Sequence, residues 1–252
     1  MPALVDRLAA LREEGGRAVV FTVLEGEHAG RKLLVVEVGE TIGDAPSALL
    51  AMADDVLRGG RNRLLELDDA RVFAEWYGPP PRLFVYGAVD TAEALCRAAG
   101  LLGWRTIVAD ARARFATPER IPSADELVVA WPDEALARVR PDHQTAVVVL
   151  THDDKFDEPA LVGALATDAF YIGALGSRRN QERRRERLLE AGVGEEQLAR
   201  ISGPCGLDVG ADTQEETAVS ILAEILAVRA GRAGGPLQDS ARRIHAEVEA
   251  AT

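Results

Sequence analysis

The segment RLFVYGAVDTAEALCRAAGLLGWRTIVAD (residues 82–110) decides the fold class of this chain. An apolar run at 83–87 leads into a glycine turn, and a helical pattern at 91–103 precedes a second apolar run at 105–110. This β-α-β order is typical of parallel sheets that bind nucleotides. Val89, however, stands where a second glycine would let the backbone approach a pyrophosphate. The segment therefore leaves open whether the chain binds a dinucleotide or another ligand.

Apolar strands and amphipathic helices keep alternating after this segment, which predicts an α/β domain with a parallel sheet covered on both faces, over residues 83–231. Thr213 and Glu216 fit a capping box at the start of the last helix. The further strands are predicted at 126–130, 145–151 and 169–176, and the further helices at 132–139, 158–167, 177–192 and 213–231.

A small α+β domain is predicted to precede this sheet, over residues 1–77. Three consecutive prolines cannot continue a helix or a central strand, so residues 78–82 are interpreted as a stiff linker. Residues 232–252 are predicted to form a loosely packed tail. The first domain is expected to contain helices at 3–14 and 46–60 and strands at 17–24, 31–39, 61–67 and 70–77.

Charge and cysteine content exclude several classes of function. The formal net charge of −12 disfavours nucleic acid or an anionic membrane surface as a partner, because both reward a basic face. Two cysteines do not make a disulfide framework or a zinc site, and no apolar run approaches the roughly 20 residues that span a bilayer. The N-terminal segment is an amphipathic helix pattern rather than a signal peptide, so we expect a cytoplasmic protein.

Ligands of parallel sheets bind at the carboxyl ends of the strands. This rule selects Gly87–Asp90, Asp110, Thr151–Asp154 and Gly173–Arg179, each of which follows a predicted strand. Asp110 ends the second strand, where an acid commonly accepts a ribose hydroxyl and favours NAD over NADP; the alternative is a tight turn with a solvated aspartate. THDDKFD (151–157) can bind a divalent metal or transfer protons, although Asp157 followed by Pro159 also fits a helix cap.

GALGSRR (173–179) is the segment that most indicates an anion site. Two arginines at a helix N-terminus are electrostatically poor unless an anion lies there, and a phosphate would satisfy both. The later arginines at 183–187 are predicted to form a solvated helix face. The cofactor-binding candidates are Gly87, Ala88, Val89, Asp90, Asp110, Arg112, Thr151, Gly173, Gly176, Ser177, Arg178 and Arg179, and the catalytic candidates are His152, Asp153 and Cys205, the last either a reactive thiolate or a small buried side chain.

Together these motifs resemble the XdhC/CoxI family of xanthine dehydrogenase accessory proteins. The resemblance implies a Rossmann-like domain that binds molybdenum cofactor, protects it during sulfuration and delivers it to a molybdenum hydroxylase. It also implies a homodimer and interactions with a cysteine desulfurase and the apo-hydroxylase. The matching segments are PPPRLFVYGAVD (79–90), ARARFATPERIPSADELVVAWP (111–132), VVVLTHDDKFDEPALVGAL (147–165), YIGALGSRRNQERRRERLLEAG (171–192) and GLDVGADTQEETAVSILAEIL (206–226).

The chain departs from the family pattern at several positions. Val89 and Asp90 replace a histidine that many members carry in the glycine turn, and Cys205 and Gln214 also differ from the usual residues. Residues 1–77 lack the GS-x-PR stretch and the cysteine often found in the family's N-terminal domain. An NAD(P)-dependent oxidoreductase on the same scaffold, or a docking protein without catalytic role, remain alternative hypotheses.

Overall fold

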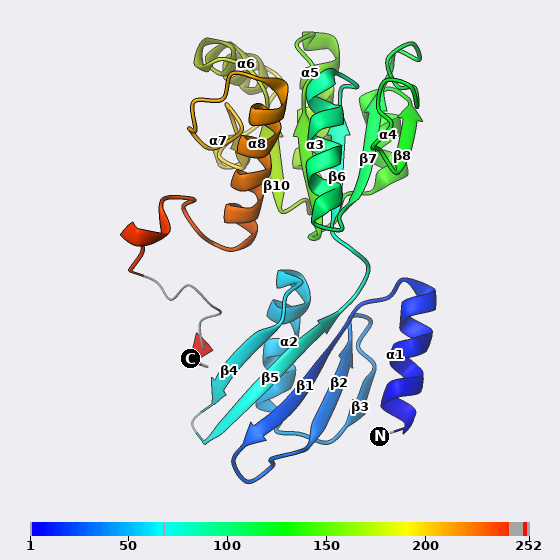
Figure 1. Ribbon diagram of the computed structural model, residues 1–252, viewed down its shortest axis with the longest axis vertical. Helices are drawn as coiled ribbons and strands as arrows, with labels where there is room; N and C mark the ends of the chain where they lie inside the picture. Colours follow the sequence, from blue (N-terminus) through cyan, green and yellow to red (C-terminus); the bar gives the residue numbers. More distant parts are fainter. Residues whose placement is uncertain (1, 68, 242–248, 251–252) are drawn as a thin grey trace. The chain divides into compact units, whose positions relative to one another are not determined.

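The computed structural model describes residues 2–67, 69–241 and 249–250, and the chain divides into two compact units (Figure 1). The first unit comprises Met1–Pro79 and Gly235–Thr252, and the second comprises Pro80–Gly234. The boundary therefore falls inside the predicted linker. The C-terminal residues, predicted as a separate tail, group with the first unit, where β12 (Glu249–Ala250) pairs with β4 (Arg63–Leu67).

The first unit is an antiparallel sheet, extended by the parallel strand β12, with one helix on each face. Alternate residues of one strand supply the two faces: Val19 and Phe21 pack under α2 (Ala48–Gly59), whereas Ala18 and Val20 pack under α1 (Pro2–Glu14). The strand order is β12-β4-β5-β1-β2-β3, with β1 at Ala18–Glu25, β2 at Lys32–Val36, β3 at Thr41–Gly43 and β5 at Ala70–Tyr77.

The second unit is a six-stranded, fully parallel sheet with the strand order β11-β10-β9-β6-β7-β8. Counted within the unit, that order is 6-5-4-1-2-3, the Rossmann arrangement, so the predicted fold class is confirmed. The order reverses between β6 and β9, and this switch point is where such sheets bind ligands. The strands are β6 (Arg82–Tyr86), β7 (Arg105–Asp110), β8 (Glu126–Val129), β9 (Thr145–Val149), β10 (Tyr171–Ala174) and β11 (Ile201–Ser202).

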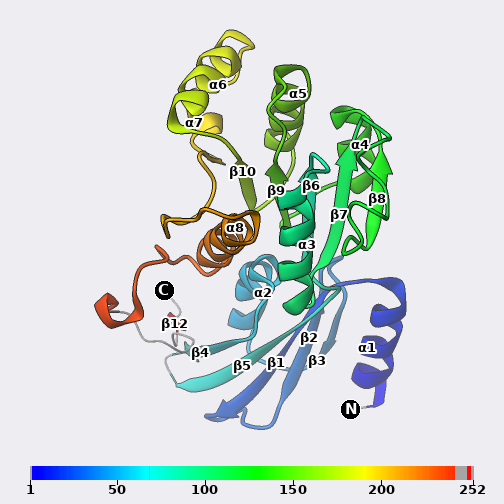
Figure 2. The same ribbon diagram turned by 45° about the horizontal axis from the view of Figure 1, so that its top comes forward.

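Helices cover both faces of this sheet, as the continuous apolar strands require. Leu83 and Val85 of β6 pack with α3 and α8, which lie side by side in Figure 2, whereas Phe84 and Tyr86 pack with α4, α5 and α6. None of the helices in the described ranges is long and apolar enough to cross a membrane. The helices are α3 (Asp90–Leu101), α4 (Pro132–Val139), α5 (Asp154–Leu165), α6 (Arg178–Glu190), α7 (Glu195–Leu198) and α8 (Gln214–Arg229), and the first unit adds a short 3-10 helix, η1 (Leu237–Asp239).

Local signals placed some boundaries correctly and misplaced others. The capping box at α8 is confirmed, because Thr213 Oγ1 accepts a hydrogen bond from Glu216 N at 3.1 Å and the Glu216 carboxylate accepts one from Thr213 N at 2.9 Å. Helix α5, predicted to start at residue 158, starts at Asp154 because Asp153 caps it. The short elements β3, α7 and β11 were not predicted, since each has too few residues to show a periodic pattern.

Candidate functional site

The turn after β6 fits closely against the end of β9. Gly87 has φ +115°, a backbone conformation that residues with a side chain rarely adopt. A Cβ at this position would lie 3.1 Å from Thr151 N. Its own N–H donates to Ala109 O of β7 at 2.8 Å. Glycine at this position therefore allows the segments after β6 and β9 to meet at the switch point.

Thr151 brings a buried polar atom to this junction. The residue is 3% exposed, and its Oγ1 has no hydrogen-bond partner in the described part of the chain. A buried hydroxyl without a partner costs free energy comparable to a lost hydrogen bond, so such groups in native proteins usually meet water or a ligand. Thr151 Oγ1 is therefore a fitting contact for a bound polar group.

Asp110 is not the solvated carboxylate that a simple turn would produce. It is 1% exposed, and it accepts hydrogen bonds from Ala88 N at 3.0 Å, Arg112 N at 2.9 Å, and Arg112 Nε and Nη2 at 2.8 Å each. Burial alone raises the pKa of this carboxyl, but the bonds from Arg112 and Ala88 outweigh it and hold the pKa below its usual value. A carboxylate has about four lone-pair sites, so none is left for a ribose hydroxyl.

The segment after β9 caps a helix and does not gather metal ligands. Asp153 accepts from Lys155 N at 3.3 Å and lies 3.4 Å from Lys155 Nζ, while His152 and Asp153 are both exposed. No group of three or more His, Cys, Asp and Glu side chains that would suit a metal ion occurs within the ranges that the structure describes. The expected cap at Asp157 is wrong, because this residue lies inside α5 and is 2% exposed.

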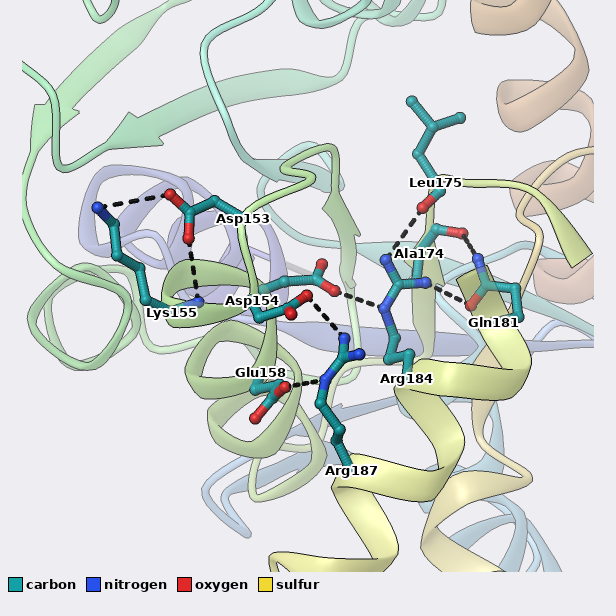
Figure 3. Close-up of polar contacts among 10 residues, drawn as sticks. Asp153, Asp154, Lys155, Glu158, Ala174, Leu175, Gln181, Arg184 and Arg187 are labelled. Carbon is teal, nitrogen blue, oxygen red and sulfur yellow. Dashed lines mark hydrogen bonds and ion pairs between the residues drawn. The ribbon is translucent and has the colours of Figure 1, made fainter. Parts of the chain in front are cut away.

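Asp157 instead pairs with a buried arginine of the next helix. Arg184 Nε donates to Asp157 Oδ2 at 2.5 Å, and the guanidinium also donates to Gln181 Oε1 and, at 3.1 Å, to Leu175 O (Figure 3). Arg184 is 4% exposed, so the predicted solvated helix face is wrong at this position. Its spacing of four residues from the buried Leu188 was the signal for burial.

A second arginine of α6 strengthens the contact with α5. Arg187 Nη2 donates to Asp154 at 2.7 Å and Nε donates to Glu158 (Figure 3). These pairs tie the first two turns of α5 to the last turn of α6. The two helices that follow β9 and β10 are thus fixed to each other by charged side chains as well as by apolar packing.

The turn between β10 and α6 leaves two arginines available for a ligand. Gly176 has φ +140°, and Ser177 Oγ caps α6 by accepting from Asn180 N at 3.2 Å. Arg178 and Arg179 are exposed, no acid lies in the first turn of α6, and neither arginine has a hydrogen-bond or ion-pair partner among the described residues. Their position is electrostatically unfavourable until an anion binds.

Backbone carbonyls of the same turn are held by side chains of α6. Gln181 Nε2 donates to Ala174 O at 3.0 Å and Arg184 Nη2 donates to Leu175 O (Figure 3). Sequence analysis missed these roles of Gln181 and Arg184, because the carbonyls that they hold are main-chain atoms that carry no sequence signature. These contacts give the exposed pair of arginines a fixed base.

A pocket of about 490 Å³ lies beside α6, in the size range of small-molecule sites. Arg178 lines it, whereas Gly87, Thr151 and Arg179 do not. Its remaining lining comes from α6, α7 and the segment after α7: Gln181, Glu182, Arg184, Arg185, Leu188, Glu195, Leu198, Ala199, Ile201, Gly203 and Pro204.

Cys205 lies in surroundings that favour its protonated form. It is 8% exposed, and burial, with the nearby Glu224 carboxylate adding to it, raises the pKa of the thiol to about 12. The same carboxylate accepts from Tyr171 Oη at 2.5 Å and from Gly206 N at 2.7 Å. Of the two interpretations of this residue, the small buried side chain fits these contacts better than the thiolate.

We expect both thiols of the folded protein to react slowly. Burial also raises the pKa of Cys96 to about 12, so at pH 8 a thiol-exchange reagent should label Cys96 and Cys205 at least ~1000-fold more slowly than a free thiol. The control is the same protein in guanidinium chloride, where both should react at the ordinary rate. One fast-reacting thiol in the folded protein, lost on Cys205→Ser, would establish a reactive Cys205.

Comparison with known proteins matches this second unit. A family model described as the XdhC Rossmann domain matches residues 83–225. The chain is 35% identical over 167 residues to the uncharacterized protein YqeB of Escherichia coli (strain K12), covering 65% of this chain and 30% of YqeB. It is 34% identical over 158 residues to a protein of Bacillus subtilis (strain 168) named as a probable xanthine dehydrogenase subunit, covering 63% of this chain and 46% of that protein.

A third relative and a solved structure agree with these matches. The chain is 31% identical over 157 residues to the molybdenum cofactor insertion chaperone PaoD of Escherichia coli (strain K12), covering 62% of this chain and 43% of PaoD. The matches span less than half of the length of each of these three relatives. A crystal structure of a xanthine dehydrogenase from Bacillus halodurans shares the fold, with a TM-score of 0.64, 24% identity, and coverage of 90% of this chain and 65% of that one.

Proposed function

This chain belongs to the XdhC family, and we propose that it binds molybdenum cofactor and delivers it to a molybdenum hydroxylase of the xanthine dehydrogenase type. The names of two relatives support this role, one a molybdenum cofactor insertion chaperone and the other a probable xanthine dehydrogenase subunit. When bound, the cofactor supplies the pterin-held molybdenum that the client enzyme requires.

The observation that carries this proposal is that Arg178 and Arg179, at the start of α6, have no partner among the described residues. Arg178 and Arg179 offer guanidinium donors, and their own N–H groups lie in the first turn of a helix, where the dipole favours an anion. The phosphate of a pterin cofactor is such an anion, and arginine binds phosphate in a bidentate manner.

The orphaned hydroxyl at the switch point fits the remainder of a cofactor that extends from this phosphate. Strands β9 and β10 are neighbours and lie about 4.8 Å apart, so Thr151, after β9, and the two arginines, after β10, follow adjacent strands. A cofactor whose phosphate binds Arg178 and Arg179 can therefore extend toward Thr151 Oγ1, which has no partner of its own in the described part of the chain. Exposed His152 and Asp153, which directly follow Thr151, are proposed to handle protons at the edge of this site.

The experiment that tests the proposal replaces both arginines. Arg178→Gln with Arg179→Gln removes two charge-assisted contacts and should weaken binding of purified molybdenum cofactor by about 100-fold or more, as measured by fluorescence titration without oxygen. The matched control is Arg183→Gln, because Arg183 is an exposed arginine of the same helix without a partner among the described residues. The affinity of this variant for molybdenum cofactor should stay within about twofold of that of the unchanged protein. Undiminished binding by the double variant would refute the site.

The Rossmann strand order keeps an NAD(P)-dependent oxidoreductase as the second candidate. Protection against thermal unfolding by NAD or NADP, with none from molybdenum cofactor, would favour it. A homodimer, a cysteine desulfurase partner and a cytoplasmic location stay predictions.

A further inference from the structure

Three arginines surround one aromatic ring in the loop that follows β7. The guanidinium carbons of Arg112, Arg114 and Arg120 lie 4.3, 4.7 and 5.1 Å from the ring centroid of Phe115, and we name these four residues the Phe115 cluster. Such distances are within the range of cation–π contacts. The chain has a net charge of −12, so three arginines around one ring form a local concentration of positive charge in an acidic protein.

The loop that carries the cluster is anchored in the core. Ala116 and Ile121 are 7% and 1% exposed and belong to the apolar cluster under α3 and α8. Successive turns stabilise the backbone, with Phe115 N donating to Arg112 O at 2.8 Å and Arg120 N donating to Thr117 O at 3.1 Å. The arginines therefore extend from a fixed backbone at the carboxyl edge of the sheet.

Arg112 is oriented so that one side of its guanidinium faces away from Asp110. Nε and Nη2 donate to the Asp110 carboxylate, and Nη1, which does not, keeps its N–H groups for other acceptors. The guanidinium carbon lies over the Phe115 ring and, at 5.5 Å from its centroid, over the Phe156 ring. The buried acid thus serves to position Arg112 and leaves donors free at the position after the second strand.

The acids near the cluster do not neutralise it fully. Asp90, whose side chain is 83% exposed, lies 3.4 Å from Arg120, and Asp153 acts on Arg112 through its charge but is itself paired with Lys155. Arg114 is exposed and has no carboxylate partner in the ranges that the structure describes. Free donors from three guanidiniums therefore exceed the acceptors around them.

We infer that the Phe115 cluster binds the phosphate of a 2′-phosphorylated adenosine, with the adenine ring stacked on Phe115. In Rossmann sheets the residue after the second strand meets the ribose, an acid there accepts its hydroxyls, and an arginine accommodates a 2′-phosphate. Asp110 has no free lone pair, whereas Arg112 and Arg114 have free donors. The site should therefore prefer NADP to NAD, the reverse of the preference that Asp110 predicts from the sequence. This inference does not depend on the proposed molybdenum cofactor site.

Affinity at this site is expected to come from the ribose phosphate more than from a pyrophosphate. The turn after β6 has Val89 in place of a second glycine, and Asp90 and Glu93 place negative charge in the first turn of α3. A pyrophosphate would meet those acids, whereas a 2′-phosphate would meet the guanidiniums of the cluster.

The test compares two ligands that differ by a single phosphate. NADP⁺ and NAD⁺ are titrated into the full chain by calorimetry at low ionic strength, and NADP⁺ should bind about tenfold more tightly or better. Arg114→Gln should reduce that ratio to about threefold or less, whereas Arg97→Gln, an exposed arginine of α3, should leave it unchanged. Phe115→Leu should weaken both ligands to a similar extent by removing the stacking surface.

Three results would overturn the inference. Equal affinities for NADP⁺ and NAD⁺, or no binding of either at millimolar concentration, would refute a 2′-phosphate site. Competition by inorganic phosphate at the same concentration as NADP⁺ would mean an adventitious ion only. Variants separate this site from the proposed function, because Arg178→Gln with Arg179→Gln should keep the NADP⁺ preference and Arg114→Gln should keep binding of molybdenum cofactor.

Discussion

Replacing Arg184 with alanine should destabilise the second unit by about 3–5 kcal/mol, because it leaves the Asp157 carboxylate buried without its charge partner. Both side chains are nearly inaccessible, at 5% and 3% exposed, and the Nε–Oδ2 distance is 2.5 Å. Asp157 Oδ1 has no hydrogen-bond partner in the described part of the chain, so no other hydrogen bond to this carboxylate would remain. Urea unfolding followed by circular dichroism measures the change in the free energy of unfolding.

Two further variants separate the buried pair from a general effect of α6. Arg183→Ala, one residue earlier and exposed, should change the free energy of unfolding by no more than about 0.5 kcal/mol. Arg184→Met combined with Asp157→Leu removes both charges and should recover most of the loss, since apolar replacements of a buried pair are often neutral. A loss below about 1 kcal/mol for Arg184→Ala would contradict the buried pair.

Gly87→Ala should also lower stability strongly, by about 2–4 kcal/mol, because of both strain and overlap. The residue would have to adopt φ +115°, and its Cβ would lie 3.1 Å from Thr151 N and 3.2 Å from the Leu150 carbonyl carbon. These are backbone atoms, which cannot rotate aside as a side chain can. The expected decrease in melting temperature is about 4–16 °C for a unit of this size.

The control is the same substitution at a glycine without these constraints. Gly100 lies in α3, and a Cβ at this position would have no atom within 4 Å apart from the backbone of its own helix. Gly100→Ala should therefore raise stability by up to about 1 kcal/mol. Equal melting temperatures for Gly87→Ala and Gly100→Ala would show that the turn after β6 does not fit closely against the end of β9.

The fold class could be predicted because apolar runs and helical patterns alternate clearly after residue 82. Strand order could not be read in this way, since alternation is the same for every doubly wound sheet. The start of α5 was misplaced because Asp153 and Asp157 are both plausible caps. Only the packing of α6 against α5 shows that Asp157 accepts a hydrogen bond from the buried Arg184 and does not cap the helix.

Strand-end positions could be selected from the sequence, whereas the contacts of each side chain could not. The rule selected Asp110 and Thr151, but nothing in the sequence indicates that Arg112 folds back and fills the acceptors of Asp110. Nor does sequence predict that Thr151 Oγ1 is left without a partner among the described residues. Both depend on side-chain directions that packing alone decides.

An NMR titration of the full chain with molybdenum cofactor decides whether the cofactor phosphate binds at the start of α6. We predict that the largest amide shifts occur at Gly176, Ser177, Arg178 and Arg179, because the first-turn N–H groups of α6 would receive the phosphate. Binding that shifts signals elsewhere and leaves these four amides unchanged would contradict it, as would the absence of any shift at saturating cofactor.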